Sequence, residues 1–104
     1  MLSQAEILST IKTLVKEEIP DAKVYLFGSR ATGKVHEESD WDILVITRLI
    51  VDKNLKRKVR NKIHSITLSI FSFIDLIIVN EKEWKESPSY YALNISIKDE
   101  VIAI

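Results

Sequence analysis

The segment Gly28–Asp42 reads GSRATGKVHEESDWD and contains both glycines of the chain. The apolar run Val24–Phe27 leads into this segment, and a second apolar run, Ile43–Ile46, follows it. Short runs rich in β-branched and aromatic residues, bounded by glycine and polar residues, are typical of strands. The sequence therefore predicts two strands joined by a polar loop, and the glycines and aspartates of that loop indicate a functional site.

The segments on either side of this pair indicate an α/β architecture. Apolar residues recur at three- and four-residue spacing in Ser3–Glu18, which begins with a capping-box pattern, and again in Asp52–Leu68, so both are expected to be amphipathic helices. Further expected elements are strands at Lys23–Phe27, Trp41–Thr47 and Ser69–Val79, a short helix through Tyr90, Tyr91 and Leu93, and an edge strand within Val101–Ile104. This order predicts a compact α/β sandwich whose chemistry lies at the strand ends that face the glycine loop.

Composition limits the classes to which the chain can belong. Its 104 residues are expected to form one domain, residues 1–104, with one hydrophobic core. The chain is 46% hydrophobic and 29% charged, as in ordinary soluble globular domains, and no segment approaches a membrane span. The absence of cysteine excludes disulfides and thiolate sites, and a cytoplasmic protein is expected. Fifteen basic and fifteen acidic residues cancel, so any nucleic-acid binding would be local.

Three aspartates are the candidate metal ligands. Asp40 and Asp42 are two residues apart, so on a strand their side chains point the same way. Asp75 lies inside an apolar strand, where an unpaired charge facing the core would cost several kcal/mol. If the two strands are neighbours, three carboxylates meet, and such hard oxygen ligands suit Mg²⁺ or Mn²⁺. The structural alternatives are that Asp40 caps the loop, that Asp42 faces solvent, and that Asp75 is exposed on an edge strand.

The residues that follow the first strand directly are the candidate anion ligands. Gly28 allows the backbone to approach a phosphate closely, and the turn that opens there offers N–H groups and the Ser29 hydroxyl. Arg30 and Lys34 would add positive charge beside that phosphate, although each can also be an ordinary solvated loop residue. The sequence thus predicts an anion site next to the aspartates.

Two other patterns leave alternatives open. The run from Gly28 to Lys34 fits most of a P-loop, G-x-x-x-x-G-K, but Val35 stands where a Ser or Thr should bind magnesium. Six basic residues between Lys53 and Lys62 form the outer face of the second long helix. Such a run is typical of a solvated surface, and contact with RNA or with an acidic partner is the alternative.

The spacing of these residues resembles a known family. An apolar strand ending in Gly28-Ser29, ten further residues, the pair Asp40 and Asp42 around an apolar residue, and Asp75 in a later strand are similar to the nucleotidyltransferases of the DNA polymerase β-like superfamily. The minimal nucleotidyltransferase (MNT) group resembles the chain most. The resemblance implies a small mixed β-sheet with helices packed on one side.

The resemblance also implies roles for the candidate residues. Gly28 and Ser29, with Arg30 beside them, would hold the phosphates of ATP. Asp40 and Asp42 would bind two Mg²⁺ ions, with Mn²⁺ possible, and Asp75 would complete one metal site and help deprotonate an acceptor hydroxyl. In-line displacement at phosphorus with two cations requires neither cysteine nor a catalytic histidine.

Partners are implied in the same way. MNT proteins work as antitoxins with a HEPN-family ribonuclease, to which they transfer AMP on a tyrosine, so a HEPN-type toxin is the expected partner. The acceptor surface would come from another protein or subunit, and a homo-oligomer is compatible with this. Two alternatives stay open: a non-catalytic antitoxin of the same fold, and a nucleotidyltransferase acting on RNA or on a small molecule such as an aminoglycoside.

Overall fold

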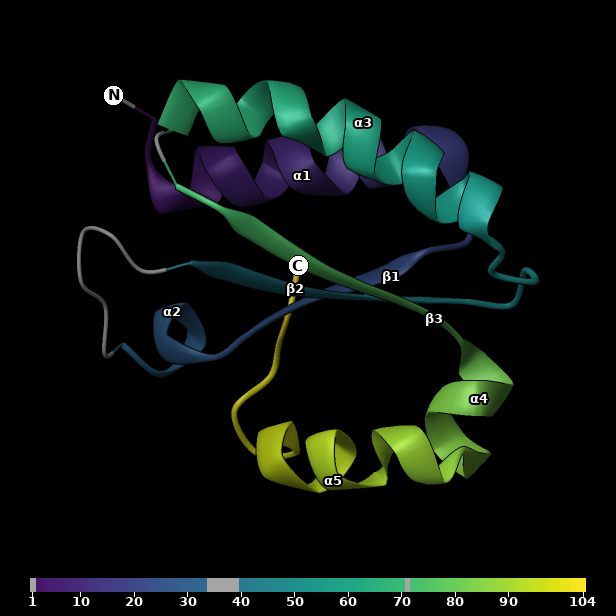
Figure 1. Cartoon of the computed structure of the whole chain (residues 1–104). Coiled ribbons are helices and arrows are strands. Elements are labelled where there is room, and N and C mark those ends of the chain that lie inside the picture. Colours follow the sequence, from purple (N-terminus) through teal and green to yellow (C-terminus); the bar gives the residue numbers. More distant parts are fainter. Residues whose placement is uncertain (1, 34–39, 71) are drawn as a thin grey trace.

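The computed structural model of the chain describes residues 2–33, 40–70 and 72–104. Helices and strands alternate along the chain up to β3, and two short helices and a last short strand follow (Figure 1). In chain order the elements are α1 (Gln4–Glu18), β1 (Lys23–Phe27), α2 (Ser29–Thr32), β2 (Trp41–Thr47), α3 (Lys53–Ile70), β3 (Ile74–Asn80), α4 (Glu81–Glu86), α5 (Pro88–Ile97) and β4 (Ile102–Ala103). None of the helices within these residues combines the length and apolar character needed to cross a membrane.

The strands form one four-stranded mixed sheet in the order β3-β2-β1-β4. β1 pairs antiparallel with both β2 and β4, whereas β2 and β3 are parallel. A parallel pair needs a long crossover connection, and α3 provides it. The expected fold class, a small mixed sheet with helices in the manner of polymerase β-like nucleotidyltransferases, is confirmed, and β4 confirms the expected edge strand.

The two long helices cover one face of the sheet side by side (Figure 1). Ser3 caps α1, and reciprocal hydrogen bonds between Ser3 and Glu6 complete the predicted capping box. Each helix buries an apolar stripe against the sheet. The buried residues are Ile7, Ile11 and Val15 of α1 and Val59, Ile63 and Ile66 of α3.

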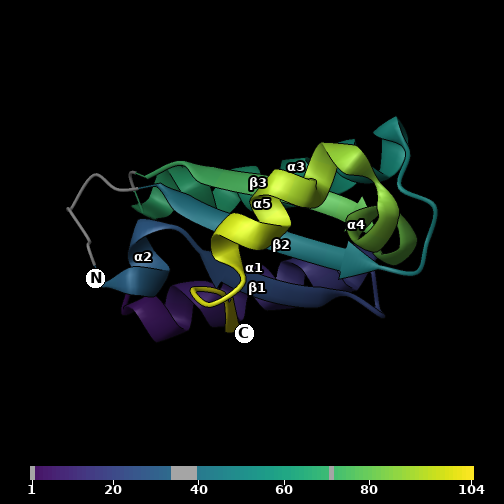
Figure 2. The ribbon, with the colours of Figure 1, turned by 90° about the horizontal axis from the view of Figure 1, so that it is seen from below.

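The short helices α4 and α5 lie over β2 and β3 on the opposite face (Figure 2). The resemblance implied helices on one side of the sheet only. This holds for α1 and α3, whereas α4 and α5 cover the other side. The reason lies in β2, where five of seven residues are buried, so both faces of the central strand need cover. A second, smaller apolar cluster of Phe27, Leu44, Val79 and Ile97 fills this side.

One predicted boundary is wrong. The third strand was expected from Ser69, but α3 continues to Ile70 and β3 begins at Ile74. Ile66 and Ile70 lie four residues apart and both pack into the main core, so helical packing outweighs the β-propensity of this segment. The expected short helix is α5, which begins at Pro88 after the N-cap Ser87.

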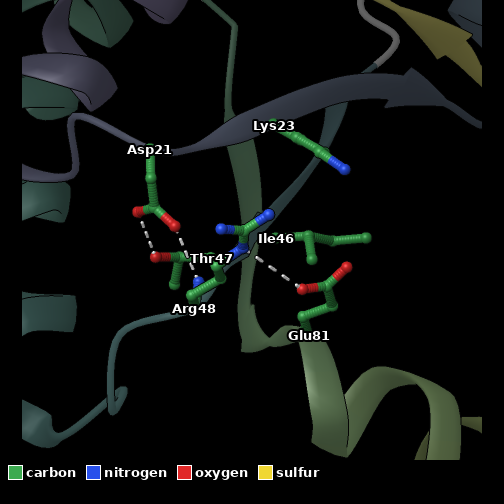
Figure 3. A pocket seen from close by; sticks show the side chains of 6 residues that line it. All are labelled: Asp21, Lys23, Ile46, Thr47, Arg48 and Glu81. Carbon is green, nitrogen blue, oxygen red and sulfur yellow. Dashed lines mark hydrogen bonds and ion pairs between the residues drawn. The ribbon is translucent and has the colours of Figure 1, made fainter.

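Asp21 binds the residues at the end of β2 that lies away from the glycine loop (Figure 3). The Thr47 hydroxyl donates to Asp21 Oδ1 at 2.6 Å, and the Arg48 backbone N–H donates to Oδ2 at 2.8 Å. These two donors hold the pKa of Asp21 below its ordinary value of 3.8. Arg48 also pairs with Glu81 of α4 at 3.8 Å, across an open groove of about 220 Å³.

Thr47→Val is expected to lower the free energy of unfolding by about 1–2 kcal/mol, because the hydroxyl also accepts from the Leu49 N–H and would leave two partners unsatisfied. Because the pKa of Asp21 is lowered in the folded protein, the stabilisation by its hydrogen bond with Thr47 is fully present above the pKa of Asp21 in the unfolded chain. This stabilisation is lost as the pH falls through the pKa of Asp21 in the folded protein. Urea unfolding at about pH 6 and about pH 3 measures both effects.

Thr13→Val is the matched control for this experiment. Thr13 is exposed on α1, and its hydroxyl donates only to the Ser9 carbonyl of the same helix. Its loss should change the free energy of unfolding by less than about 0.5 kcal/mol at either pH. Equal losses in the two variants would contradict the role given to Asp21.

Candidate active site

The glycine turn at the end of β1 forms the first wall of the candidate site. Gly28 has φ 75° and ψ −156°, a conformation that side chains disfavour, and its carbonyl accepts from the Ala31 and Thr32 N–H groups to start α2. Gly33 ends α2 in the left-handed region, with φ 80°. The sequence therefore places its two glycines where the backbone needs positive φ.

Gly28 lies directly against Asp42. A Cβ built on Gly28 would stand 2.2 Å from Asp42 Oδ2, far inside contact distance. The strands explain the approach, because Phe27 and Asp42 are register partners in the β1–β2 pair and Gly28 follows Phe27. The backbone of the glycine turn therefore lies in direct contact with the Asp42 carboxylate of β2.

The register of β2 and β3 brings a second carboxylate to the same place. Asp42 and Asp75 are direct partners in the parallel pair, and partners in a sheet present their side chains on the same face. Further along the same face, Leu44 and Val79 enter the apolar cluster beneath α5. Asp75 is exposed and Asp42 is half-buried, so this end of the face is open to a ligand.

Asp40 lies just before β2 and is exposed. The pKa of Asp42 is raised, first by its burial and then by the negative charges of Asp75 and Asp40. Both neighbours therefore lie within electrostatic reach of the Asp42 carboxylate. A cation placed among these carboxylates would remove that repulsion.

The carboxylates do not form a complete metal cage by themselves. Within residues 2–33, 40–70 and 72–104, no group of three or more His, Cys, Asp or Glu side chains is arranged to hold a metal ion. Mg²⁺, however, is commonly held by one or two carboxylates together with water and substrate phosphates. The paired Asp42 and Asp75 fit that kind of site, to which a triphosphate would bring the other oxygens.

Arg30 makes a contact that the sequence analysis did not predict. Its Cζ atom lies 3.9 Å from the ring centroid of Trp41, a cation–π geometry. Burial lowers the pKa of Arg30, while the charge of Asp40 acts in the opposite direction. Trp41 is 2% exposed, and the spacing of the two residues gives no sign of the stacked guanidinium.

Neither Lys34, a predicted anion ligand, nor the two histidines, which are not catalytic candidates by sequence, can be assigned to the site. Lys34 and His36 fall outside the described residues. His64 is exposed on α3, where Lys53, Arg57 and Arg60 are also exposed, and none of these belongs to the turn or to the aspartate pair.

A family model described as "Polymerase beta, Nucleotidyltransferase" matches residues 9–101. The chain belongs to this nucleotidyltransferase family. The match spans the glycine turn, all three aspartates, strands β1, β2 and β3, and α5, and it ends just before β4. The resemblance derived from the residue pattern is thereby confirmed at the level of the family.

Individual members of the nucleotidyltransferase family are similar over parts of their length. The chain is 37% identical over 49 residues to the "Probable protein adenylyltransferase MntA" of Haemophilus influenzae, a match that covers 47% of this chain and 43% of that relative. The aligned part is thus less than half of the relative.

Solved structures that share the fold include the following two. One is a chain in the complex of tri-AMPylated Shewanella oneidensis HEPN toxin with MNT antitoxin, at 19% identity and TM-score 0.64, covering 97% of this chain and 71% of that one. The other is spectinomycin adenyltransferase AAD(9) from Enterococcus faecialis with ATP and spectinomycin, at 17% identity and TM-score 0.70, covering 97% and 48%. At these identities the likeness concerns the fold alone.

Proposed function

We propose that this nucleotidyltransferase transfers AMP from ATP, with Mg²⁺, to a tyrosine hydroxyl of a HEPN-type toxin and thereby acts as its antitoxin. One observation carries the enzymatic part: Asp42 and Asp75 are register partners on one open face, and the Gly28 backbone lies against Asp42. That arrangement suits the placing of a triphosphate between a glycine turn and two acidic ligands. The acceptor and the partner are suggested by the relatives named MntA and MNT antitoxin.

The proposed roles follow from position. Gly28 and Ser29 bind the β- and γ-phosphates, and Arg30 adds positive charge beside the turn. Asp40, Asp42 and Asp75 provide the carboxylates for Mg²⁺, of which two ions are expected. When bound, Mg²⁺ neutralises phosphate charge and stabilises the entering and leaving oxygens.

The transfer itself is an in-line displacement. The acceptor oxygen forms a bond to the α-phosphorus, the bond from that phosphorus to the α,β-bridging oxygen breaks, and pyrophosphate leaves. Asp75 is exposed at the mouth of the site, so its carboxylate can accept the proton of the acceptor hydroxyl. No covalent intermediate with the protein is needed.

The exposed basic residues of α3 support a second candidate, transfer to RNA. Lys56, Arg57 and Lys58 follow one another in this helix, Arg57 and Lys58 exposed and Lys56 half-buried, and would contact phosphates. Neutralising all three should remove RNA binding if this candidate is correct. No corresponding change is expected if the acceptor is a protein.

The test is to add ATP labelled on its α-phosphate, with Mg²⁺, to the purified protein in an extract of its source cells. Label in one discrete protein band, absent with Asp42→Asn, is the expected result and identifies the acceptor. Label in RNA or in a small molecule would overturn the antitoxin proposal. Neutralisation of a bound toxin without any labelling, and equally by Asp42→Asn, would favour a non-catalytic antitoxin.

A further inference from the structure

Trp41 is held in place at the start of β2 by burial and by a backbone hydrogen bond. Its side chain is 2% exposed within the main core, and its backbone N–H donates to the Phe73 carbonyl at 2.9 Å, just before β3. It stands between the two aspartates in sequence, so the position of its backbone sets the positions of Asp40 and Asp42. A displacement of Trp41 would displace both carboxylates.

Arg30 belongs to the other wall of the site. It is the second residue of α2, one position after Ser29, and Ala31 next to it packs against the main core. The guanidinium lies over the Trp41 ring at 3.9 Å from the centroid. A planar guanidinium can stack in this way, whereas a lysine ammonium lacks the flat surface. The stack therefore joins the glycine turn to the first residue of β2, on the side of the strand that packs into the main core.

We propose that Trp41 is a positioning residue that, through its stack with Arg30, holds the phosphate-binding turn in register with the aspartate pair. This inference rests on the proposed function, since it assigns the turn to the triphosphate and the aspartates to Mg²⁺. The Arg30 charge also stays close to Asp40, which it partly balances before a cation binds. Phosphate ligands and metal ligands come from different elements, so their relative placement decides how well one triphosphate meets both.

The experiment uses the Trp84→Phe protein as its reference. The chain has two tryptophans, and Trp84 lies in α4 against Tyr90, on the other face of the sheet, so this change leaves Trp41 as the only indole emitter. MgATP binding should change the Trp41 emission in the reference protein. Arg30→Lys should shift the emission without nucleotide and should weaken the response to MgATP.

A double-mutant cycle then separates positioning from general stability. Arg30→Lys and Trp41→Phe are each expected to raise the KM for MgATP about 3- to 10-fold with little change in kcat, and the double variant should be no worse than the worse single one. Trp41→Phe keeps an aromatic ring in the core, which guards against loss of the fold. Additive effects of the two changes, or an unchanged KM, would overturn the inference.

Failure of the proposed function and failure of the positioning role would give different results. If the folded reference protein neither binds MgATP nor transfers label, the proposed function and this inference are both wrong. If it transfers label while the cycle shows no coupling between Arg30 and Trp41, only the positioning role is wrong. A larger rise of KM in Trp41→Leu than in Trp41→Phe supports the stack over mere filling of volume, because only the phenylalanine keeps a ring beneath the guanidinium.

Discussion

Asp42→Asn is expected to reduce nucleotidyl transfer about a thousandfold or more while making the protein without metal more stable. The loss of activity follows because the amide cannot provide the negative charge that Mg²⁺ requires at the partner position of Asp75. The gain in stability follows because burial and the charges of Asp75 and Asp40 disfavour the ionised Asp42 carboxylate. One substitution should therefore move activity and stability in opposite directions.

The pH dependence of that stability difference has a defined sign. Asp42 has a folded pKa raised above the ordinary value of 3.8, so between the two values the native state binds more protons than the unfolded state, and stability falls as pH rises. The destabilisation by the ionised Asp42 carboxylate is complete above its pKa in the folded protein and absent below its pKa in the unfolded chain. Thermal midpoints should therefore be higher for Asp42→Asn at about pH 7 and should converge towards about pH 3.5.

Mg²⁺ provides the control for the same pair of proteins. Adding it at about pH 7 should raise the thermal midpoint of the original protein more than that of Asp42→Asn, because a bound cation removes the repulsion that the amide has already removed. Equal shifts in both proteins, or a lower midpoint for Asp42→Asn without metal, would contradict the placement of Asp42 in the cation site.

Gly28→Ala is expected to reduce transfer at least about a hundredfold, since small misplacements of reacting groups have effects of that size. The added Cβ would lie 2.2 Å from Asp42 Oδ2, so the carboxylate must rotate away from its present position. Backbone strain from positive φ should lower the free energy of unfolding by about 1–2 kcal/mol. Steady-state transfer kinetics and urea unfolding measure the two parts.

Gly33→Ala separates the collision from the strain. Gly33 has nearly the same φ, 80°, but no atom of the described residues lies within 4 Å of an added Cβ. We expect a similar loss of stability with transfer retained within a few-fold. If the two alanine variants lose transfer equally, backbone strain explains the effect and the contact between Gly28 and Asp42 does not.

The elements nearest the site could be predicted from the sequence because local chemistry determines them. Strands Lys23–Phe27 and Trp41–Thr47 have the predicted bounds, since a glycine ends the first and the apolar run defines the second. The start of β3 could not be predicted, because residues such as Ile66 and Ile70 suit either helix or strand until the core selects one. The roles of the six site residues remain predictions that activity measurements must decide.

Contacts between distant segments lie beyond what periodicity can predict. The stack of Arg30 on Trp41 depends on how α2 returns towards β2, and nothing in the spacing of the two residues encodes it. The close approach of Gly28 to Asp42 is similar: a glycine before Ser29 suggests a phosphate as the neighbour, whereas the structure adds a carboxylate. The register of β1 and β2 brings Gly28 against Asp42, and the register of β2 and β3 pairs Asp42 with Asp75.

The register of β2 and β3 also limits how this chain can diverge during evolution. A shift by one residue would exchange the faces of β3, turning Asp75 towards α3 and exposing Leu76 and Ile78, which now fill the main core. Insertions or deletions inside either strand would thus be eliminated by misfolding before selection could act on catalysis. Lineages that lose the activity can change their aspartates freely, yet they must keep the strand lengths that once aligned them.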